Sequence, residues 1–82
     1  MNIEWSDKAL DHLAFIRKSI ARRPPTSAQN MVARIYQRVT LLGTVPFIGS
    51  KVSVCKDQNI REVYESPYRI FYRVTPTHIE VL

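Results

Sequence analysis

The fold of this chain is decided by residues 60–74, whose sequence is IREVYESPYRIFYRV. Two runs rich in Val, Ile, Tyr and Phe flank Ser66-Pro67, a pattern typical of a β-hairpin. A two- or four-residue loop centred on that dipeptide places Val63 opposite Ile70 and Tyr64 opposite Arg69. A three-residue loop would instead shift the register and turn one strand over.

Alternation along the predicted hairpin gives it two faces. The face expected to cover the core carries Arg61, Val63, Glu65, Tyr68, Ile70 and Tyr72. The opposite face carries Ile60, Glu62, Tyr64, Arg69, Phe71 and Arg73. Arg61 is the unusual member of the core face, and we expect it either to pair with Glu65 or to lay its alkyl stem under the helices.

Two amphipathic helices are predicted before the hairpin. The first follows the N-cap Ser6, runs to about Ala21, and has an apolar stripe formed by Ala9, Leu10, Leu13, Ile16 and Ile20. The second begins at Thr26 with a capping box that includes Gln29 and ends at the C-cap Gly43. Its stripe consists of Ala28, Met31, Val32, Ile35, Val39 and Leu42. The short connection through Pro24-Pro25 favours an antiparallel αα-hairpin.

The remaining segments complete a small sheet. Residues 1–5 alternate as an opening strand, residues 51–54 favour a short edge strand, and residues 78–82 form a last strand after a turn at 75–77. A tight turn there places Ile79 and Val81 beside Tyr72 and Ile70, and Arg73 beside His78. The expected fold class is α+β, in the order β-α-α-β-β-β, as one domain over residues 1–82 with both helices on one face of an antiparallel sheet.

Composition limits the function. Twelve Lys and Arg against seven Asp and Glu give a net charge of +5, which suits a nucleic acid or an acidic protein as partner, although a basic domain without such a role has the same composition. A single cysteine excludes an internal disulfide and fits a reducing cytoplasm, and no signal peptide or membrane span is found. The two histidines are isolated, so we expect no metal site and no cofactor.

Four features together resemble the RelE/ParE superfamily of toxins from bacterial type II toxin–antitoxin modules. They are the opening strand and helix with Leu13, Ile16 and Ile20, the segment LGTVPFIG at residues 42–49, the run IREV at 60–63, and the run YRIFYRV at 68–74. The resemblance spans nearly the whole chain and implies a small cytoplasmic toxin of a plasmid stabilisation module. It also implies a cognate acidic antitoxin that neutralises the toxin by laying a tail across its surface.

The resemblance leaves two activities open, because RelE-like toxins cleave mRNA on the ribosome and ParE-like toxins inhibit DNA gyrase. Metal-free RNA cleavage needs a proton acceptor, a proton donor and cationic stabilisation of the phosphate. RelE-like toxins meet these needs in part with lysines on the strand before the Tyr-Arg run. This chain has Glu62 on that strand, and its negative charge would repel a phosphate. The ParE-like interpretation is therefore favoured. If the chain is a nuclease, its candidate catalytic residues are Arg69, His78 and Tyr64.

The residues expected to contact the antitoxin are exposed aromatic groups and arginines. They are Phe15 on the polar side of the first helix, Tyr36 beside the second stripe, and Arg69, Phe71 and Arg73 on the non-core face of the hairpin. Many members of the superfamily continue beyond the last strand with a short basic segment. A third interpretation is therefore a truncated or degenerate toxin that only binds its antitoxin. The antitoxin's identity and the oligomeric state do not follow from the sequence.

Overall fold

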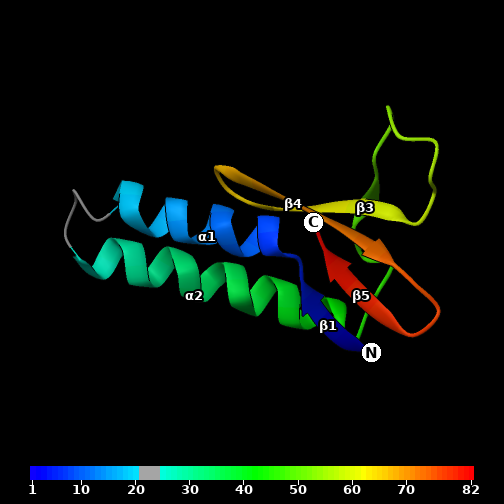
Figure 1. Ribbon diagram of the computed structural model, residues 1–82, viewed down its shortest axis with the longest axis horizontal. Helices are drawn as coiled ribbons and strands as arrows, with labels where there is room; N and C mark the ends of the chain where they lie inside the picture. Colours follow the sequence, from blue (N-terminus) through cyan, green and yellow to red (C-terminus); the bar gives the residue numbers. More distant parts are fainter. Residues whose placement is uncertain (21–24) are drawn as a thin grey trace.

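The structure is a computed structural model that describes residues 1–20 and 25–82, and their side chains except those of residues 25–29. The expected α+β class is confirmed: two helices pack on a five-stranded sheet (Figure 1). The elements in chain order are β1 (Asn2–Trp5), α1 (Asp7–Ile20), α2 (Pro25–Leu42), β2 (Ser50–Lys51), β3 (Ile60–Glu65), β4 (Tyr68–Val74) and β5 (His78–Val81).

The sheet is mixed, with the strand order β1-β5-β4-β3-β2. Strands β5, β4, β3 and β2 are antiparallel to one another in this order, whereas β1 pairs in parallel with β5, from Asn2 opposite His78 to Trp5 opposite Val81. The expectation of a wholly antiparallel sheet is therefore wrong for β1. Alternation of apolar residues indicates which face of a strand is buried, and it carries no information on the direction of a strand that pairs across the whole chain.

The predicted β3–β4 hairpin is confirmed residue by residue. Val63 lies opposite Ile70, Arg61 opposite Tyr72, and Glu65 opposite Tyr68 next to the turn at Ser66-Pro67. Because side chains alternate between the two faces, this register places Val63, Ile70 and Tyr72 in the core. It commits Glu62, Tyr64, Arg69 and Phe71 to the opposite face, which is also as predicted.

The pairing of β4 with β5 differs from the prediction by two residues. Tyr72 lies opposite Val81 and Val74 opposite Ile79, so Arg73 is opposite Glu80 and not beside His78. The cause is a turn that lies one residue later: the backbone amide of Thr75 donates to the carbonyl of His78 at 2.9 Å, which leaves Pro76 and Thr77 as the loop. A shift by an even number of residues keeps each side chain on its face, so the predicted burial of Ile79 and Val81 is still correct.

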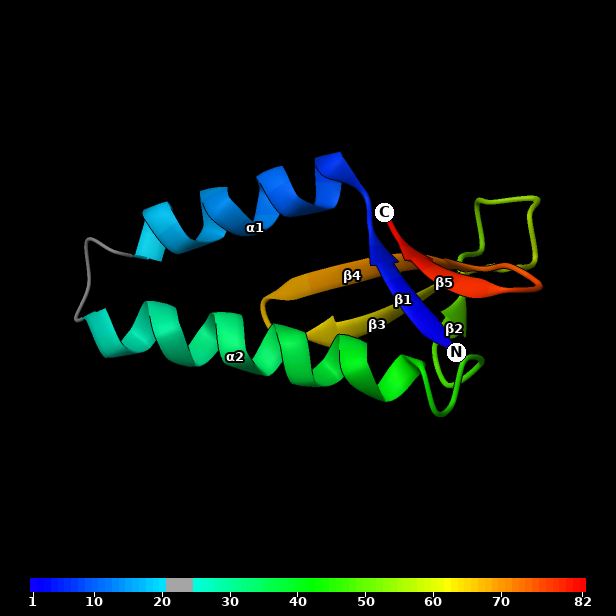
Figure 2. The same ribbon diagram turned by 60° about the horizontal axis from the view of Figure 1, so that its bottom comes forward.

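The core lies between the helical hairpin and one face of the sheet. Its fully enclosed side chains include Leu42, Val39, Tyr72, Ile79 and Val81, and the predicted Ile16 and Ile20 pack against them while partly exposed. In Figures 1 and 2 the far end of the helical hairpin, where α1 ends and α2 begins, projects past the strands. No helix in the described ranges is both long enough and apolar enough to span a membrane.

The helices follow the predicted pattern with two corrections. Ser6 caps α1 through a bond from the Ala9 amide to its hydroxyl oxygen at 3.0 Å, as expected. Leu10, however, is an exposed residue and not part of the buried stripe, which is narrower than predicted because only Ala9 and Leu13 of α1 are buried. The second helix begins at Pro25 rather than Thr26, and the predicted capping box and Ala28 fall outside the residues whose side chains are described.

Gly43 follows the end of α2 as predicted, but the reason for glycine is space. Its φ is not positive, and a Cβ at this position would lie 2.8 Å from the carbonyl oxygen of Met1. The edge strand expected at residues 51–54 is also shorter and earlier than predicted, since β2 consists of Ser50 and Lys51 only. The turn at residues 57–59 is confirmed by a bond from the Asn59 amide to the Asp57 carboxylate at 2.9 Å.

The loop between α2 and β2 is held by two side chains from the sheet. The Tyr72 hydroxyl donates to the carbonyl of Pro46 at 2.8 Å and accepts from the amide of Gly49 at 2.9 Å. Arg61 donates to the carbonyl of Gly49 at 3.0 Å and lies over the Phe47 ring at 4.7 Å. Arg61 was expected to pair with Glu65 or to lie under the helices, whereas its contacts are with the loop that precedes β2.

Candidate interaction site

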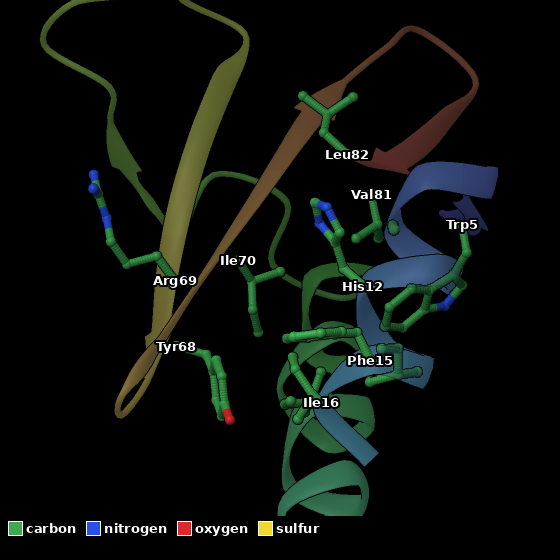
Figure 3. Close-up of a pocket in the computed structure, with 12 residues that line it drawn as sticks. Trp5, His12, Phe15, Ile16, Tyr68, Arg69, Ile70, Val81 and Leu82 are labelled. Carbon is green, nitrogen blue, oxygen red and sulfur yellow. The ribbon is translucent and has the colours of Figure 1, made fainter. Parts of the chain in front are cut away.

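A groove opens between α1 and the strands β4 and β5, with a volume of about 270 Å³. Its floor is formed by buried core residues, namely Leu13, Ile35, Ile70 and Val81. One wall comes from the start of the chain and α1, with Trp5, His12, Phe15 and Ile16, and the other from Tyr68 and Leu82 (Figure 3). The groove is therefore apolar at its base, with the polar groups of His12 and Tyr68 at its rim.

Phe15 is the most exposed aromatic side chain at this groove. It is 70 % exposed, as expected from its position outside the apolar stripe of α1. Tyr36 is also exposed, but its ring packs against Trp5 with the ring centroids 5.1 Å apart. Trp5 lines the groove together with Phe15 and also contacts Tyr36 of α2. It therefore lies close to both aromatic residues that were predicted on the helical side.

The face of the sheet that points away from the helices carries a second cluster. Here the Tyr64 hydroxyl donates to Oε1 of Glu62 at 2.6 Å, and the Arg69 guanidinium forms an ion pair with Oε2 of the same carboxylate. The carbon of that guanidinium lies 5.9 Å from the centre of the Tyr64 ring and 5.0 Å from that of Phe71. Arg69 is therefore flanked by two aromatic rings and bonded to an acid.

Glu62 is the one charged residue that is buried in the described part of the chain. The hydrogen bond from Tyr64 and then the bond from Arg69 lower the pKa of its carboxyl, so it is ionised at neutral pH. The hydrogen bond that Tyr64 donates to Glu62 raises the pKa of the Tyr64 hydroxyl, because ionisation would break that bond and place a second negative charge beside Glu62. Tyr64 is consequently a poorer proton acceptor at neutral pH than an isolated tyrosine.

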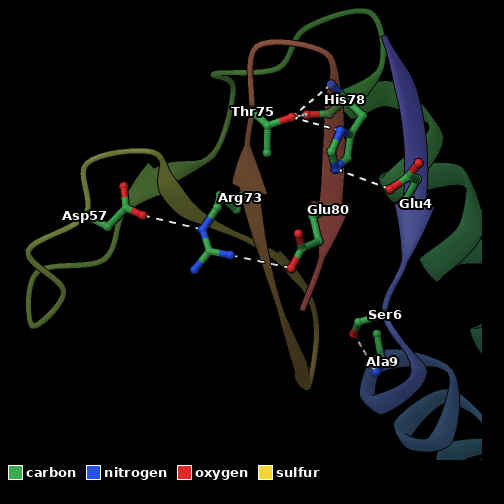
Figure 4. A network of polar contacts seen from close by, with 8 residues as sticks. All are labelled: Glu4, Ser6, Ala9, Asp57, Arg73, Thr75, His78 and Glu80. Carbon is green, nitrogen blue, oxygen red and sulfur yellow. Dashed lines mark hydrogen bonds and ion pairs between the residues drawn. The ribbon is translucent and has the colours of Figure 1, made fainter.

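Arg73 and His78 form two further sets of polar contacts on this same face (Figure 4). Arg73 reaches Asp57 at 3.4 Å and Glu80 at 3.5 Å. His78 lies 3.2 Å from the carboxylate of Glu4, and its other ring nitrogen is 3.0 Å from the Thr75 hydroxyl. The predicted neighbourhood of Arg73 and His78 is not formed, because the register of β5 places Glu80 opposite Arg73.

The five residues expected to contact an antitoxin thus divide between two surfaces. Phe15 and Tyr36 lie on the helical side, whereas Arg69, Phe71 and Arg73 lie on the opposite face of the sheet. Arg69 contributes to the wall of the groove, but its guanidinium points away from it (Figure 3). Of the candidate nuclease residues, Tyr64 and Arg69 share one cluster, whereas His78 lies outside it, in contact with Glu4 and Thr75.

Sequence reasoning missed several members of these surfaces. His12, Tyr68 and Leu82 line the groove without having been singled out, and only the packing of α1 reveals them. The contact between Glu62 and Tyr64 could have been found, because residues two apart on a strand share a face. Glu80 could be placed beside Arg73 only with the correct register of β5.

Comparison with solved structures finds a close likeness of fold. A structure described as the chromosomal ParDE TA system from P. aeruginosa superposes with a TM-score of 0.80, and the likeness covers 100 % of this chain and 90 % of that chain. The two sequences are 22 % identical, so the similarity shows the fold. No curated protein matches this chain.

The chain therefore has the same α+β fold as that structure over its whole length. Comparison with protein families matches residues 3–82, nearly the full length, to the family described as ParE toxin of type II toxin-antitoxin system, parDE. The chain belongs to the ParE toxin family. The suspected membership in the RelE/ParE superfamily, closer to ParE, is confirmed.

Proposed function

We propose that this chain is a cytoplasmic toxin that inhibits DNA gyrase and is neutralised by a cognate acidic antitoxin. Membership in the ParE toxin family supports the assignment to a toxin–antitoxin module. The observation that carries the choice of target is the Glu62 cluster, because it occupies the place where a nuclease of this superfamily would need positive charge.

The chemistry of the cluster argues against cleavage of a phosphodiester. Such cleavage requires a proton acceptor, a proton donor and cationic stabilisation of the phosphate. Glu62 is ionised and pairs with Arg69, so its charge opposes an incoming phosphate at the one arginine of the site. Tyr64 is bound to the same carboxylate and has a raised pKa, so it does not supply the base.

The groove beside α1 supports the antitoxin part of the proposal. Its floor is apolar, and the exposed Phe15 lies at its wall, which suits the apolar side of a peptide that folds on binding. The two helices carry five Lys and Arg side chains at residues 8, 17, 18, 34 and 38. Against them stand the carboxylates of Asp7 and Asp11 and that of Glu65 on β3, which pairs with Arg34 and Arg38, so an excess of positive charge remains. An acidic antitoxin is attracted to that side of the molecule, with Phe15 and Tyr36 as its aromatic contacts.

The target is tested with purified gyrase and supercoiled plasmid. We expect the toxin to trap gyrase–DNA cleavage complexes, seen as linear plasmid after denaturation, and we expect the purified antitoxin to abolish the effect. A parallel assay uses translating ribosomes and a defined message. Codon-specific cuts in that message, lost in Arg69→Ala or His78→Ala, would show instead a RelE-like ribosome-dependent nuclease. Inactivity in both assays, with antitoxin binding intact, would indicate a form that only binds its antitoxin.

A further inference from the structure

The sheet face that points away from the helices, called here the open face, has its own charge. It is formed by the outward side chains of β1, β3, β4 and β5, and the charged ones on these strands are Glu4, Glu62, Arg69, Arg73 and Glu80. Three carboxylates thus stand against two guanidinium groups. Asp57, which reaches Arg73 from the preceding loop, adds a fourth carboxylate (Figure 4).

This balance is opposite to that of the molecule as a whole. The chain has a net charge of +5, whereas four carboxylates and two guanidinium groups leave the open face with an excess of two negative charges. The excess of positive charge therefore lies elsewhere, including on the two helices. At physiological salt, charges farther apart than about 8 Å are largely screened, so a partner on the open face responds to the local carboxylates.

The arginines of the open face do not offer a site for phosphate. Arg69 is paired with the buried Glu62, and Arg73 lies between Asp57 and Glu80. Among all these charged side chains that of Glu4 is the most exposed, at 67 %, and those of Asp57 and Arg73 are exposed to a similar extent, at 41 % and 39 %. A negatively charged backbone approaching this face would meet each guanidinium together with the carboxylates that pair with it, so the face would not attract it.

The centre of the open face is aromatic. Tyr64 is 52 % exposed, and with Phe71 it flanks the guanidinium of Arg69. Tyrosine and arginine are enriched among the residues that dominate protein interfaces, and a charged rim around such a centre sets the choice of partner. Lysine and arginine side chains of a partner would find carboxylates at the rim and the face of the Tyr64 ring at the centre.

We propose that the open face is a second interaction surface, which binds a lysine- and arginine-rich protein surface and not a nucleic acid. This surface is separate from the groove beside α1, and its partner has the opposite charge to the antitoxin. If the target is gyrase, the face fits a basic patch of the kind that enzymes use to hold DNA. The inference thus deepens the proposed function, but it can be tested without gyrase.

The test maps two peptide probes on the ¹⁵N-labelled protein by NMR. A short lysine-rich peptide is expected to shift the amide signals of β4, β5 and β1, whereas a glutamate-rich peptide is expected to shift those of α1 and α2. The double variant Glu4→Gln/Glu80→Gln should weaken the binding of the lysine-rich peptide, with a rise in Kd of about two- to fivefold for each charge removed. The matched control is Asp7→Asn/Asp11→Asn, which changes the net charge equally on α1 and should leave that affinity unaltered.

Three results would overturn the proposal. They are shifts by the lysine-rich peptide that lie outside the open face, an equal weakening in the two double variants, and shifts of the open face by a DNA duplex. With gyrase, Glu4→Gln/Glu80→Gln should lower inhibition while antitoxin affinity stays unchanged. A parent protein that leaves gyrase unaffected would contradict the proposed target, and the peptide maps would still decide the charge preference of the open face.

Discussion

The amide of Gly49 donates to the hydroxyl oxygen of Tyr72 at 2.9 Å, at a point where a Cβ on residue 49 would lie 2.6 Å from that same oxygen. The close approach explains why glycine ends the LGTVPFIG segment. It also explains how an exposed loop carrying Val45, Phe47 and Ile48 is fixed to the centre of the sheet, since the same hydroxyl donates to Pro46.

Gly49→Ala should destabilise the protein by about 1–3 kcal/mol, because the added methyl group also meets the carbonyl of Glu62 at 2.7 Å and neither neighbour is the end of a flexible chain. Tyr72→Phe should cost about 1–3 kcal/mol, since it leaves a buried amide and carbonyl without partners. Urea denaturation of both variants and of the double variant gives the coupling energy. Additive effects would contradict the described contact.

The hairpin register leads to a prediction about the core. Ile70→Ala should lower the free energy of unfolding by roughly 2–5 kcal/mol, because Ile70 is buried between the sheet and the helices. Phe71→Ala, one residue later on the opposite face, is the matched control and should cost clearly less. A denaturation curve in which the two variants exchange these effects would mean that the register is shifted by one residue.

The sequence predicted much of this fold because its local signals agree with one another. The β3–β4 register followed from Ser66-Pro67 and the alternation around it, and the buried stripe of α2 followed from its spacing. The parallel pairing of β1 and the register of β5 did not follow, since they depend on contacts between distant segments and on a single hydrogen bond at Thr75. For the same reason the groove and the charge of the open face required the three-dimensional structure.

The Glu62 cluster predicts a specific pH dependence of stability. The bonds from Tyr64 and Arg69 hold the pKa of the Glu62 carboxyl below its ordinary value of 4.5 in the folded protein. A lowered folded-state pKa adds stability above the ordinary value, and that stability is lost as the pH falls through the folded-state pKa. Glu62→Gln should therefore be destabilised at neutral pH and should lose less stability than the parent on acidification below about pH 4.5.

The measurement is urea denaturation at a series of pH values, with Asp11→Asn as the control, because Asp11 is exposed on α1 and has no ion pair among the described residues. At alkaline pH, ultraviolet titration should find the Tyr64 signal closer to an ordinary tyrosine in Glu62→Gln, since the carboxylate that raises its pKa is gone. If the parent and Glu62→Gln lost the same stability on acidification, the described bonds of Glu62 with Tyr64 and Arg69 would be wrong.

The two proposed surfaces predict that binding and target inhibition can be separated by two phenylalanine variants. Phe15→Ala removes the exposed aromatic side chain of the groove. It should weaken antitoxin binding by about 2 kcal/mol or more, which is roughly a thirtyfold rise in Kd. Leu10→Ala is its control, because Leu10 is also exposed on α1 but does not line the groove. Phe71→Ala alters the open face and should reduce target inhibition while leaving antitoxin affinity within about twofold, since a contact outside an interface contributes little to it.

Calorimetric titration with the purified antitoxin measures the first effect, and the gyrase cleavage assay measures the second. Loss of antitoxin affinity in Phe71→Ala would place the antitoxin on the open face, as the sequence alone led us to expect for Arg69, Phe71 and Arg73. Unchanged affinity in Phe15→Ala would remove the groove from the antitoxin interface. If both variants kept full affinity, the exposed aromatic residues would not be the anchors, and Phe15 would only cover the apolar floor formed by Leu13 and Ile35.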